Sequence, residues 1–365
     1  MKFIVHIARV FVAITFIFSG FVKLVDPLGS AYKFEEYFGA DVLSLEFLIP
    51  YALPFAILLI IAEILLGVLL LIGFRPKFTT WSLLGITLIF LFLTWYSAYY
   101  NKVTDCGCFG DAITLTPWET FYKNIILIVL IALLVFKTEV IKPVLSSKIL
   151  KLITFGSLFI FLFITYHVLV HLPLIDFRAY AVGKNIPEGM IYPEDAKKAV
   201  YEDTWIYSVD GVEKEYTTEE KPWEITGATF VDRKTKVIEK GYELPIHDFT
   251  MEKDDVDFTD LLMQKEKLML IVMYNLQKTD KEALKNIKEV SVKAKQNGYD
   301  VYAFSSSPIE QYGKIRTDFQ LDLELLFCDE TTLKTIIRAN PGIVTLNKGT
   351  ITGKWNALDA KKVKL

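Results

Sequence analysis

The sequence predicts an α-helical membrane bundle followed by a soluble α/β domain, and three observations support this fold class. The chain is 52% hydrophobic with a mean hydropathy of +0.35, which is too apolar for a purely water-soluble protein. Residues 1–172 carry 12 of the 40 Lys and Arg residues and 10 of the 43 Asp and Glu residues, so the apolar excess lies in the first half. Residues 268–355 alternate short apolar runs with helical patterns, as in an open α/β sheet.

A transmembrane helix needs about 20 apolar residues. Five stretches meet or approach this length, namely Phe3–Leu24, Tyr51–Phe74, Phe78–Tyr99, Phe121–Phe136 and Ile149–Val170. The first is expected to be a retained helix, because Lys23–Pro27 follows it instead of the small-residue cleavage site of a signal peptide. The fourth is the shortest, and it reaches full length if Trp118 and Tyr122 act as interfacial anchors.

Basic residues near the spans predict the orientation of the bundle. With the N-terminus inside, the inside set is Lys2, Arg9, Arg75, Lys77, Lys137, Lys142, Lys148 and Lys151, and the outside set is Lys23, Lys33, Lys102 and Lys123. The positive-inside rule favours this arrangement. It places everything after residue 170 outside, which is the periplasm in a diderm bacterium. We therefore expect a multi-pass protein of the cytoplasmic membrane with a periplasmic C-terminal domain.

Residues 173–240 have no clear period. Prolines and glycines punctuate them, and residues 204–209 and 228–231 are short strand candidates. We expect an extracytoplasmic insert of mixed structure.

The last part of the chain has a regular order of elements. The predicted strands are Leu268–Tyr274, Tyr299–Phe304 and Leu323–Phe327, the predicted helices are Lys281–Gln296, Ile309–Phe319 and Thr331–Arg338, and Ile343–Leu346 and Thr350–Trp355 form a predicted hairpin. The unbroken apolar run of the first strand is typical of a strand buried on both faces. This order predicts an open α/β sheet.

Two local sequences resemble the thioredoxin fold in its peroxiredoxin-like variant. Tyr242–Thr250 looks like the entry segment of those domains, and Asn340–Val344 looks like the loop that carries their cis-proline, here Pro341. The resemblance covers residues 240–357 and implies that residues 241–365 form a thioredoxin-like domain. In that family a thiol motif follows the first central strand, but Met273–Thr279 holds no cysteine, and Cys328 does not occupy the motif position. The catalytic step of the family therefore cannot be carried over.

The same resemblance implies that residues 275–279 and the Asn340–Pro341 loop lie together at one end of the sheet. In active relatives this end offers backbone groups to an extended peptide. Asn275, Gln277, Asn340 and Pro341 are therefore candidate partner-binding residues. The alternative is that the fold serves only as a scaffold.

The candidate site for chemistry is Asp105–Asp111, between the third and fourth spans. It holds Cys106 and Cys108, two of the three cysteines of the chain. A thiol pair in an oxidising compartment can cycle between dithiol and disulfide, and a nearby cation favours the reactive thiolate. Lys123 lies about one turn into the next helix and is the candidate cation, so the candidate catalytic residues are Cys106, Cys108 and Lys123. The alternative is a structural turn whose cysteines pack or form one static bridge.

The bundle resembles the DoxX/MauE group of small membrane proteins. Three segments carry the resemblance, namely Phe18–Leu24, Ala62–Gly67 with Gly73-Phe74, and Cys106–Gly110. It implies a four-helix unit over residues 1–140, with residues 149–172 as a fifth helix, in a composite layout like that of Bacteroidetes membrane proteins. MauE-like members are associated with the maturation of periplasmic disulfide-containing enzymes, and other relatives with quinone-linked oxidoreductases. The resemblance thus implies thiol-redox or quinone-linked work, and a quinone is the one candidate cofactor.

Glu63 stands in the middle of the second span, where an ionisable side chain costs several kcal/mol unless it is paired or hydrated. Arg9 is the nearest candidate partner if the first two spans are neighbours. A packing ion pair and a role in a proton relay or cofactor contact are both open. His6, His167 and His171 lie at span ends without further ligands, so we expect no metal site.

These observations predict a thiol-redox membrane protein that presents a Cys-x-Cys pair to the periplasm. Its thioredoxin-like domain would recruit a periplasmic client protein. The rival hypothesis is a non-enzymatic assembly or scaffold subunit of a larger cell-envelope complex. The lipid bilayer is the expected surrounding, and a net charge of −3 without a basic cluster argues against a nucleic-acid partner.

Overall fold

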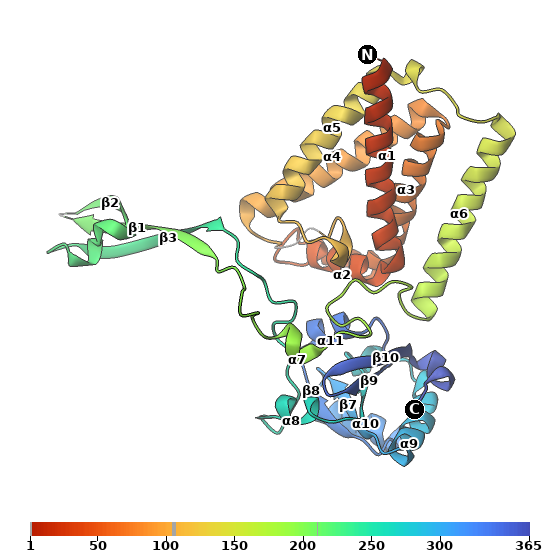
Figure 1. Cartoon of the computed structure of the whole chain (residues 1–365), viewed down its shortest axis with the longest axis vertical. Helices are drawn as coiled ribbons and strands as arrows, with labels where there is room; N and C mark the ends of the chain where they lie inside the picture. Colours follow the sequence, from red (N-terminus) through yellow and green to blue (C-terminus); the bar gives the residue numbers. More distant parts are fainter. Residues whose placement is uncertain (1, 104–106, 210) are drawn as a thin grey trace.

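The computed structural model describes residues 2–103, 107–209 and 211–365 (Figure 1). Within these residues, five helices are long and apolar enough to cross a membrane, and they match the five predicted spans. They are α1 (Lys2–Val25), α3 (Ala52–Ile72), α4 (Pro76–Tyr100), α5 (Pro117–Phe136) and α6 (Ser147–Val170). The chain is thus a multi-pass membrane protein, and the bilayer is the natural environment of these helices.

Small residues let α1 and α3 pack closely. A Cβ atom added at Gly20 would lie 2.7 Å from Cβ of Ile64, and one added at Gly67 would lie 2.8 Å from Cγ1 of Ile17. Glycines at such positions allow neighbouring helix backbones to approach each other in a membrane. The two contacts run in opposite chain directions, so α1 and α3 are antiparallel neighbours.

Helix α6 lies at the side of the bundle and packs against α3 (Figure 1). In its most apolar window 11% of the residues are buried, compared with 28–50% in the other four spans. This helix therefore exposes most of its surface to lipid.

A sixth helix of the membrane region, α2 (Pro27–Phe38), was not expected from the sequence. Asp26 is its N-cap and accepts a hydrogen bond from the amide of Gly29, and Pro27 occupies the first turn, as is common at helix starts. Helix α2 lies at the end of the bundle that faces the α/β domain (Figure 1). Short 3₁₀ turns complete the helical elements: η1 (Glu46–Tyr51), η2 (Gly110–Ala112), η3 (Thr138–Val140), η4 (Thr218–Glu220), η5 (Pro222–Glu224), η6 (Leu276–Lys278) and η7 (Ala357–Lys362).

The C-terminal part of the chain folds around a sheet with the strand order β10-β9-β6-β7-β8-β4-β5. Its strands are β4 (Glu252–Lys253), β5 (Val256–Asp257), β6 (Leu268–Val272), β7 (Asp300–Ser305), β8 (Glu324–Phe327), β9 (Gly342–Asn347) and β10 (Thr350–Asn356). Strands β6, β7 and β8 are parallel, whereas β9 runs antiparallel to β6 and forms a hairpin with β10. Its helices are α8 (Thr259–Met263), α9 (Ala283–Gln296), α10 (Ile309–Phe319) and α11 (Glu330–Ile336). The predicted strands, helices and hairpin of residues 268–355 are confirmed.

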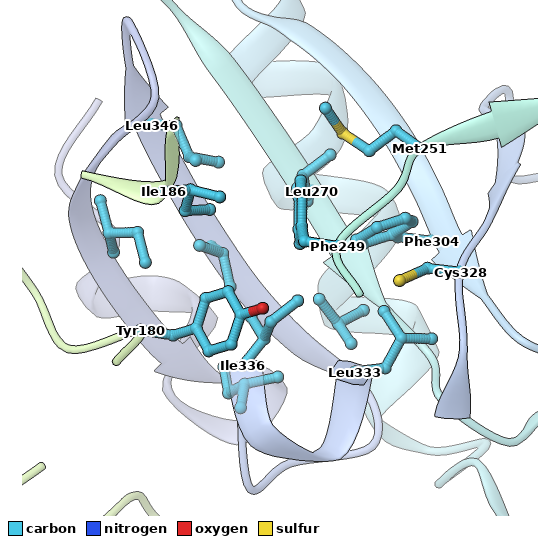
Figure 2. Close-up of a cluster of buried hydrophobic side chains, with 14 of the residues drawn as sticks. Tyr180, Ile186, Phe249, Met251, Leu270, Phe304, Cys328, Leu333, Ile336 and Leu346 are labelled. Atoms are coloured by element: carbon cyan, nitrogen blue, oxygen red, sulfur yellow. The ribbon is translucent and has the colours of Figure 1, made fainter. Parts of the chain in front are cut away.

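Two hydrophobic cores lie against the sheet, and every residue of β6 is buried between them. Figure 2 shows the first core, in which Cys328 lies beside Phe304 and Leu333. Burial raises the pKa of the Cys328 thiol to about 12. The thiol therefore stays protonated at neutral pH, and Cys328 serves as a small apolar core residue.

Residues 173–240, expected as one insert, contribute to two separate places. The first part, including α7 (Ile186–Gly189), packs on the α/β domain, because Tyr180 and Ile186 belong to its core and the amide of Gly183 donates to the Ile351 carbonyl at 2.8 Å. The second part is a three-stranded sheet, which we call the arm. Its strands are β1 (Val200–Val209), β2 (Val212–Thr217) and β3 (Thr229–Glu239), in the order β2-β1-β3. The arm projects away from both the bundle and the α/β domain (Figure 1).

Candidate functional site

The candidate site is built around the connection between α4 and α5. We call residues 107–112 the thiol loop. Cys108 is a half-buried free cysteine in this loop. Cys106, the other predicted thiol, lies outside the described residues. Gly107 has a φ of +62°, and an added Cβ there would meet Cγ of Lys33 at 3.1 Å, so the turn needs glycine for both its conformation and its close contact with α2.

Two helices hold the thiol loop. The Ser19 hydroxyl on α1 donates a hydrogen bond to the Cys108 carbonyl at 2.8 Å. The Phe109 ring packs 5.5 Å from the Phe18 ring, and the Lys123 ammonium lies 4.5 Å from the Phe109 ring centroid. Lys123 therefore lies at the loop, where it makes a cation–π interaction with Phe109, the residue after Cys108. Its effect on the thiols stays a prediction.

Glu63 is paired with a different residue from the one predicted. Oε2 of Glu63 lies 2.5 Å from Nζ of Lys23, and both side chains are buried. Arg9 instead donates to the carbonyls of Leu70 at 2.9 Å and Leu71 at 2.8 Å, at the carboxyl end of α3. The expected Arg9–Glu63 pair is wrong, because Arg9 lies about 21 Å further along α1 than Lys23 at 1.5 Å per residue. At its actual position Arg9 complements the negative end of the α3 dipole.

A small slot in the bundle connects Cys108 with two cations. It has a volume of about 70 Å³ and is lined by Cys108, Lys23 and Lys33 together with apolar side chains of α2, α3 and α4. Ligand pockets usually have volumes of about 300–1,000 Å³. The slot is therefore too small for a quinone ring, and we derive no step through a quinone.

A much larger cavity separates the bundle from the α/β domain. Its volume is about 650 Å³, which is in the range of small-molecule sites. The thiol loop contributes part of the wall, α2 and α11 contribute further parts, and the chain after α6 closes one side. The lining side chains carry both charges, namely Lys23, Asp26, Lys33, Glu35, Glu36, Asp111, Asp176, Arg178, Lys334 and Arg338.

Arg338 connects the two parts of the chain at this cavity. Its Nε lies 2.9 Å from Oδ2 of Asp26, the N-cap of α2, and its Nη2 lies 3.5 Å from Oδ2 of Asp111 in the thiol loop. Burial acts to lower the pKa of Arg338, but Asp26 and Asp111 outweigh this effect and raise the pKa. The guanidinium also lies 5.4 Å from the Tyr32 ring centroid. The sequence predicted a helix that ends at Arg338 but gave no sign of its contacts.

The carboxyl end of β6 faces α2. The Tyr32 hydroxyl donates to the Tyr274 hydroxyl at 3.4 Å, and the Lys334 ammonium lies 4.7 Å from the Tyr32 ring centroid. Tyr274 directly precedes residues 275–279, which were predicted to lie at the end of the sheet that faces a partner. The end of the sheet that was predicted to face a partner is therefore in part covered by the membrane region of the same chain.

The predicted partner-binding residues lie beside this contact. The Asn340 amide donates to the Asn275 carbonyl at 2.8 Å, and the Thr279 hydroxyl donates to Asn340 at 3.2 Å. The Asn340–Pro341 peptide bond is cis. The structure thus brings Asn275, Asn340 and Pro341 together, with Gln277 exposed in η6. Their role in binding a partner remains a prediction.

A second buried charge cluster ties the segment after α6 to β10, and the sequence did not suggest it. Asp176 forms ion pairs with Arg178 and with Lys354, each at 2.6 Å. Burial acts to raise the pKa of Asp176, but the two cations outweigh it and lower the pKa to about 2. Burial, with a smaller contribution from Arg178, lowers the pKa of Lys354 to about 7. Nearby, Nδ1 of His171 at the end of α6 lies 2.6 Å from Oδ2 of Asp359.

Among the described residues, no group of three or more His, Cys, Asp or Glu side chains is arranged to hold a metal ion. His171 is paired with Asp359, and its ring lies tilted against the His167 ring, with ring centroids 4.7 Å apart.

The comparisons with known proteins cover two parts of the chain. Residues 1–137 match the family model described as methylamine utilisation protein MauE, and residues 201–240, which make up most of the arm, match a domain of unknown function, DUF8463. No curated protein and no solved structure matches the chain. Residues 1–137 are therefore similar to MauE, and the chain is a multi-pass membrane protein that carries a C-terminal α/β domain.

Proposed function

We propose that this chain is a thiol–disulfide exchange protein of the cytoplasmic membrane and acts as an accessory to the maturation of a periplasmic client protein. The observation that carries the proposal is the position of the thiol loop. Gly107, Gly110 and Asp111 form part of the wall of the 650 Å³ cavity between the bundle and the α/β domain. A cavity of this size can hold a short segment of a client beside the thiol loop, and Cys108 of that loop lines the smaller slot, which shares Gly107 with the cavity.

The proposed exchange needs no further redox partner for a single turn. The thiolate of Cys106 or Cys108 attacks a disulfide of the client, a new S–S bond forms, and one client sulfur leaves with the electron pair and takes up a proton. The remaining cysteine then attacks the mixed disulfide and releases the second client thiol. The client gains two thiols and the chain gains a disulfide, and the reverse sequence oxidises a client.

The proposal places the N-terminus in the cytoplasm and both the thiol loop and the α/β domain in the periplasm. Two observations support it. The α/β domain meets the thiol loop at one end of the bundle through Arg338, and basic residues are more frequent in the loops at the opposite end.

We further propose that the α/β domain is a thioredoxin-like domain without its own thiols. Its three parallel strands β6–β8 and its antiparallel β9–β10 hairpin support this assignment. In this proposal residues 1–140 form the thiol-bearing unit, residues 149–172 are the fifth span, and residues 241–365 form the recruiting domain. Asn275, Gln277, Asn340 and Pro341 would contact the client beside the cavity.

The test is a Cys106→Ser/Cys108→Ser double variant expressed in place of the natural chain. The proposal expects at least one periplasmic protein to shift between its thiol and disulfide forms, as measured by thiol alkylation and gel mobility. A Cys106→Ser single variant should trap the client as a mixed disulfide with Cys108. Unchanged redox states together with no trapped species would reject the proposal.

One observation favours a non-enzymatic assembly subunit as a second candidate. The α/β domain has no cysteine at the carboxyl end of β6 and is docked on α2 and the thiol loop by a buried arginine. If the cysteine double variant behaves like the natural chain while removal of residues 173–365 is harmful, the assembly role is the better account.

A further inference from the structure

A buried ion pair lies directly beneath the thiol loop, inside the bundle. Nζ of Lys23 on α1 is 2.5 Å from Oε2 of Glu63 on α3, and the two side chains are 7% and 1% exposed. Among the described residues, Oε1 of Glu63 is the buried side-chain oxygen that has no hydrogen-bond partner. A buried carboxylate oxygen without a partner is costly, so this group needs an explanation.

Ser19 connects this pair to Cys108. Its Oγ is 2.8 Å from the Cys108 carbonyl oxygen and 3.3 Å from Oε2 of Glu63. A serine hydroxyl has one hydrogen to donate and two lone pairs that accept. The shorter distance assigns that hydrogen to the Cys108 carbonyl, and Oε2 of Glu63 lies beside the same hydroxyl. Ser19 therefore connects the Cys108 backbone with the buried Lys23–Glu63 pair.

Lys23 gives the pair a connection to both cavities. Its side chain lines the 70 Å³ slot together with Cys108, and it also lines the 650 Å³ cavity together with Asp111. The pair is therefore adjacent both to the cysteine and to the space in which a client would lie.

We propose that Ser19, Glu63 and Lys23 form a positioning unit for exchange at Cys108, an inference that rests on the proposed function. When Cys108 attacks, its S–H bond breaks, an S–S bond forms to one client sulfur, and the other client sulfur leaves with the electron pair and takes up the proton. Ser19 holds the Cys108 backbone in place during this step. The step consumes no oxidant beyond the client disulfide. Ser19 and Glu63 act through the loop and are positioning residues.

The test uses the full chain in detergent with Cys106→Ser and Cys328→Ala, so that Cys108 is the sole thiol. The probe is dithiodipyridine, a neutral disulfide whose cleavage releases thiopyridone and is followed by absorbance. Ser19→Ala and Glu63→Gln should each slow the reaction by about tenfold or more, the effect expected from loss of a hydrogen bond to a charged network. Ser19→Thr keeps the hydroxyl and should react within about threefold of the parent, a tolerance set by the strength of one neutral hydrogen bond. Arg9→Lys, a change in a buried cation at the far end of α1, is the matched control and should not alter the rate.

If Ser19→Ala and Glu63→Gln both react at the parent rate, the proposed positioning unit is rejected. A slow Ser19→Thr variant would also overturn it, because the effect would then come from packing and not from the hydroxyl. If Glu63→Gln does not fold, Ser19→Ala decides, since it leaves the Lys23–Glu63 pair in place. Unchanged client redox states in the Cys106→Ser/Cys108→Ser variant reject the proposed function itself, whereas a parent-like rate in Ser19→Ala rejects only the positioning unit.

Discussion

Single residues in this chain take their properties from their surroundings more than from their type. Lys23 and Lys123 both lie near the thiol loop, but Lys23 is 6% exposed and paired with Glu63, whereas Lys123 lies against the Phe109 ring. Cys108 and Cys328 also differ in their surroundings. Cys108 is half-buried at a slot lined by two lysines, whereas Cys328 is enclosed in an apolar core.

This contrast predicts a large difference in thiol reactivity. Because burial raises the pKa of Cys328 to about 12, its thiolate is scarce at pH 8, and the core also excludes reagents. In single-cysteine variants of the folded chain, a maleimide should modify Cys328 at least about a hundredfold more slowly than Cys108. Mass spectrometry of the intact chain measures both rates. Addition of denaturant should make the rates similar, and fast labelling of Cys328 in the folded chain would contradict the assignment.

At the scale of elements, α2 is the point where the bundle and the α/β domain meet. Its N-cap carboxylate serves both the helix and Arg338 of the other domain. The sequence predicted neither the helix nor its role, since twelve residues of mixed polarity give a weak pattern and the contact joins positions 312 residues apart.

Arg338→Gln should loosen the docking of the α/β domain. Removal of the guanidinium leaves the largely buried Asp26 carboxylate without this partner, and breaking a buried ion pair in this way typically costs about 3–5 kcal/mol. The exposed Asp111 loses the same partner at a smaller cost. Spin labels at Glu46→Cys and Lys293→Cys in a chain without its natural cysteines report the distance between the two parts by pulsed electron resonance. The distribution should broaden in Arg338→Gln.

The matched control for this experiment is Arg316→Gln. Arg316 belongs to the same domain, is exposed and lies 3.8 Å from Asp322 at the surface. Its removal should leave the distance distribution unchanged, because exposed ion pairs contribute little. Equal distributions in Arg338→Gln and the parent would show that other contacts are sufficient to hold the domain.

The ion pairs of Asp176, which tie the segment after α6 to β10, should make the free energy of unfolding depend on pH. The pKa of Asp176 is about 2 in the folded chain and 3.8 without the fold, so its contribution is complete above pH 4 and is lost as the pH falls through 2. The difference in unfolding free energy between the parent and Asp176→Asn should therefore shrink by about 2 kcal/mol between pH 5 and pH 2. Thermal unfolding of both proteins at each pH measures it, with Glu324→Gln at an exposed pair as the control. A difference that is constant with pH would contradict the assignment.

At the scale of the whole molecule, the arm stands apart from the units that hold the fold together. The described residues of its strands belong to neither core of the α/β domain. Lys240, the residue after β3, forms an exposed ion pair with Glu119 of α5 at 4.0 Å. The chain enters and leaves the arm side by side, since Val200 pairs with Glu239 and the amide of Tyr242 donates to the Lys197 carbonyl at 2.8 Å.

Replacement of residues 200–239 by a short Gly-Ser linker should therefore leave membrane insertion and the unfolding midpoint of the α/β domain unchanged within about 2 °C. The physical reason is that the ends of the removed segment are already adjacent, so closing the loop costs little. Membrane fractionation and thermal unfolding test this expectation. Loss of the folded α/β domain in this variant would contradict the expectation and would show that the arm makes contacts that stabilise the domain.

The sequence by itself determined what depends on local pattern. The length and hydropathy of the five spans, the alternation of strands and helices from Leu268 to Trp355, and the likeness of residues 1–137 to MauE were all readable without coordinates, because these signals repeat within a few residues. The position of Cys108 at the end of the bundle followed from the order of the spans.

Only the tertiary structure decided which distant residues meet. It paired Glu63 with Lys23 instead of Arg9, placed Arg338 between Asp26 and Asp111, and gave Asp176 its two cations. Each of these contacts depends on how elements from separate parts of the chain pack against each other, and the local periods of the sequence do not report that packing. The candidate residues could therefore be named in advance, but the cavity beside the thiol loop exists only because the two halves of the chain are packed together.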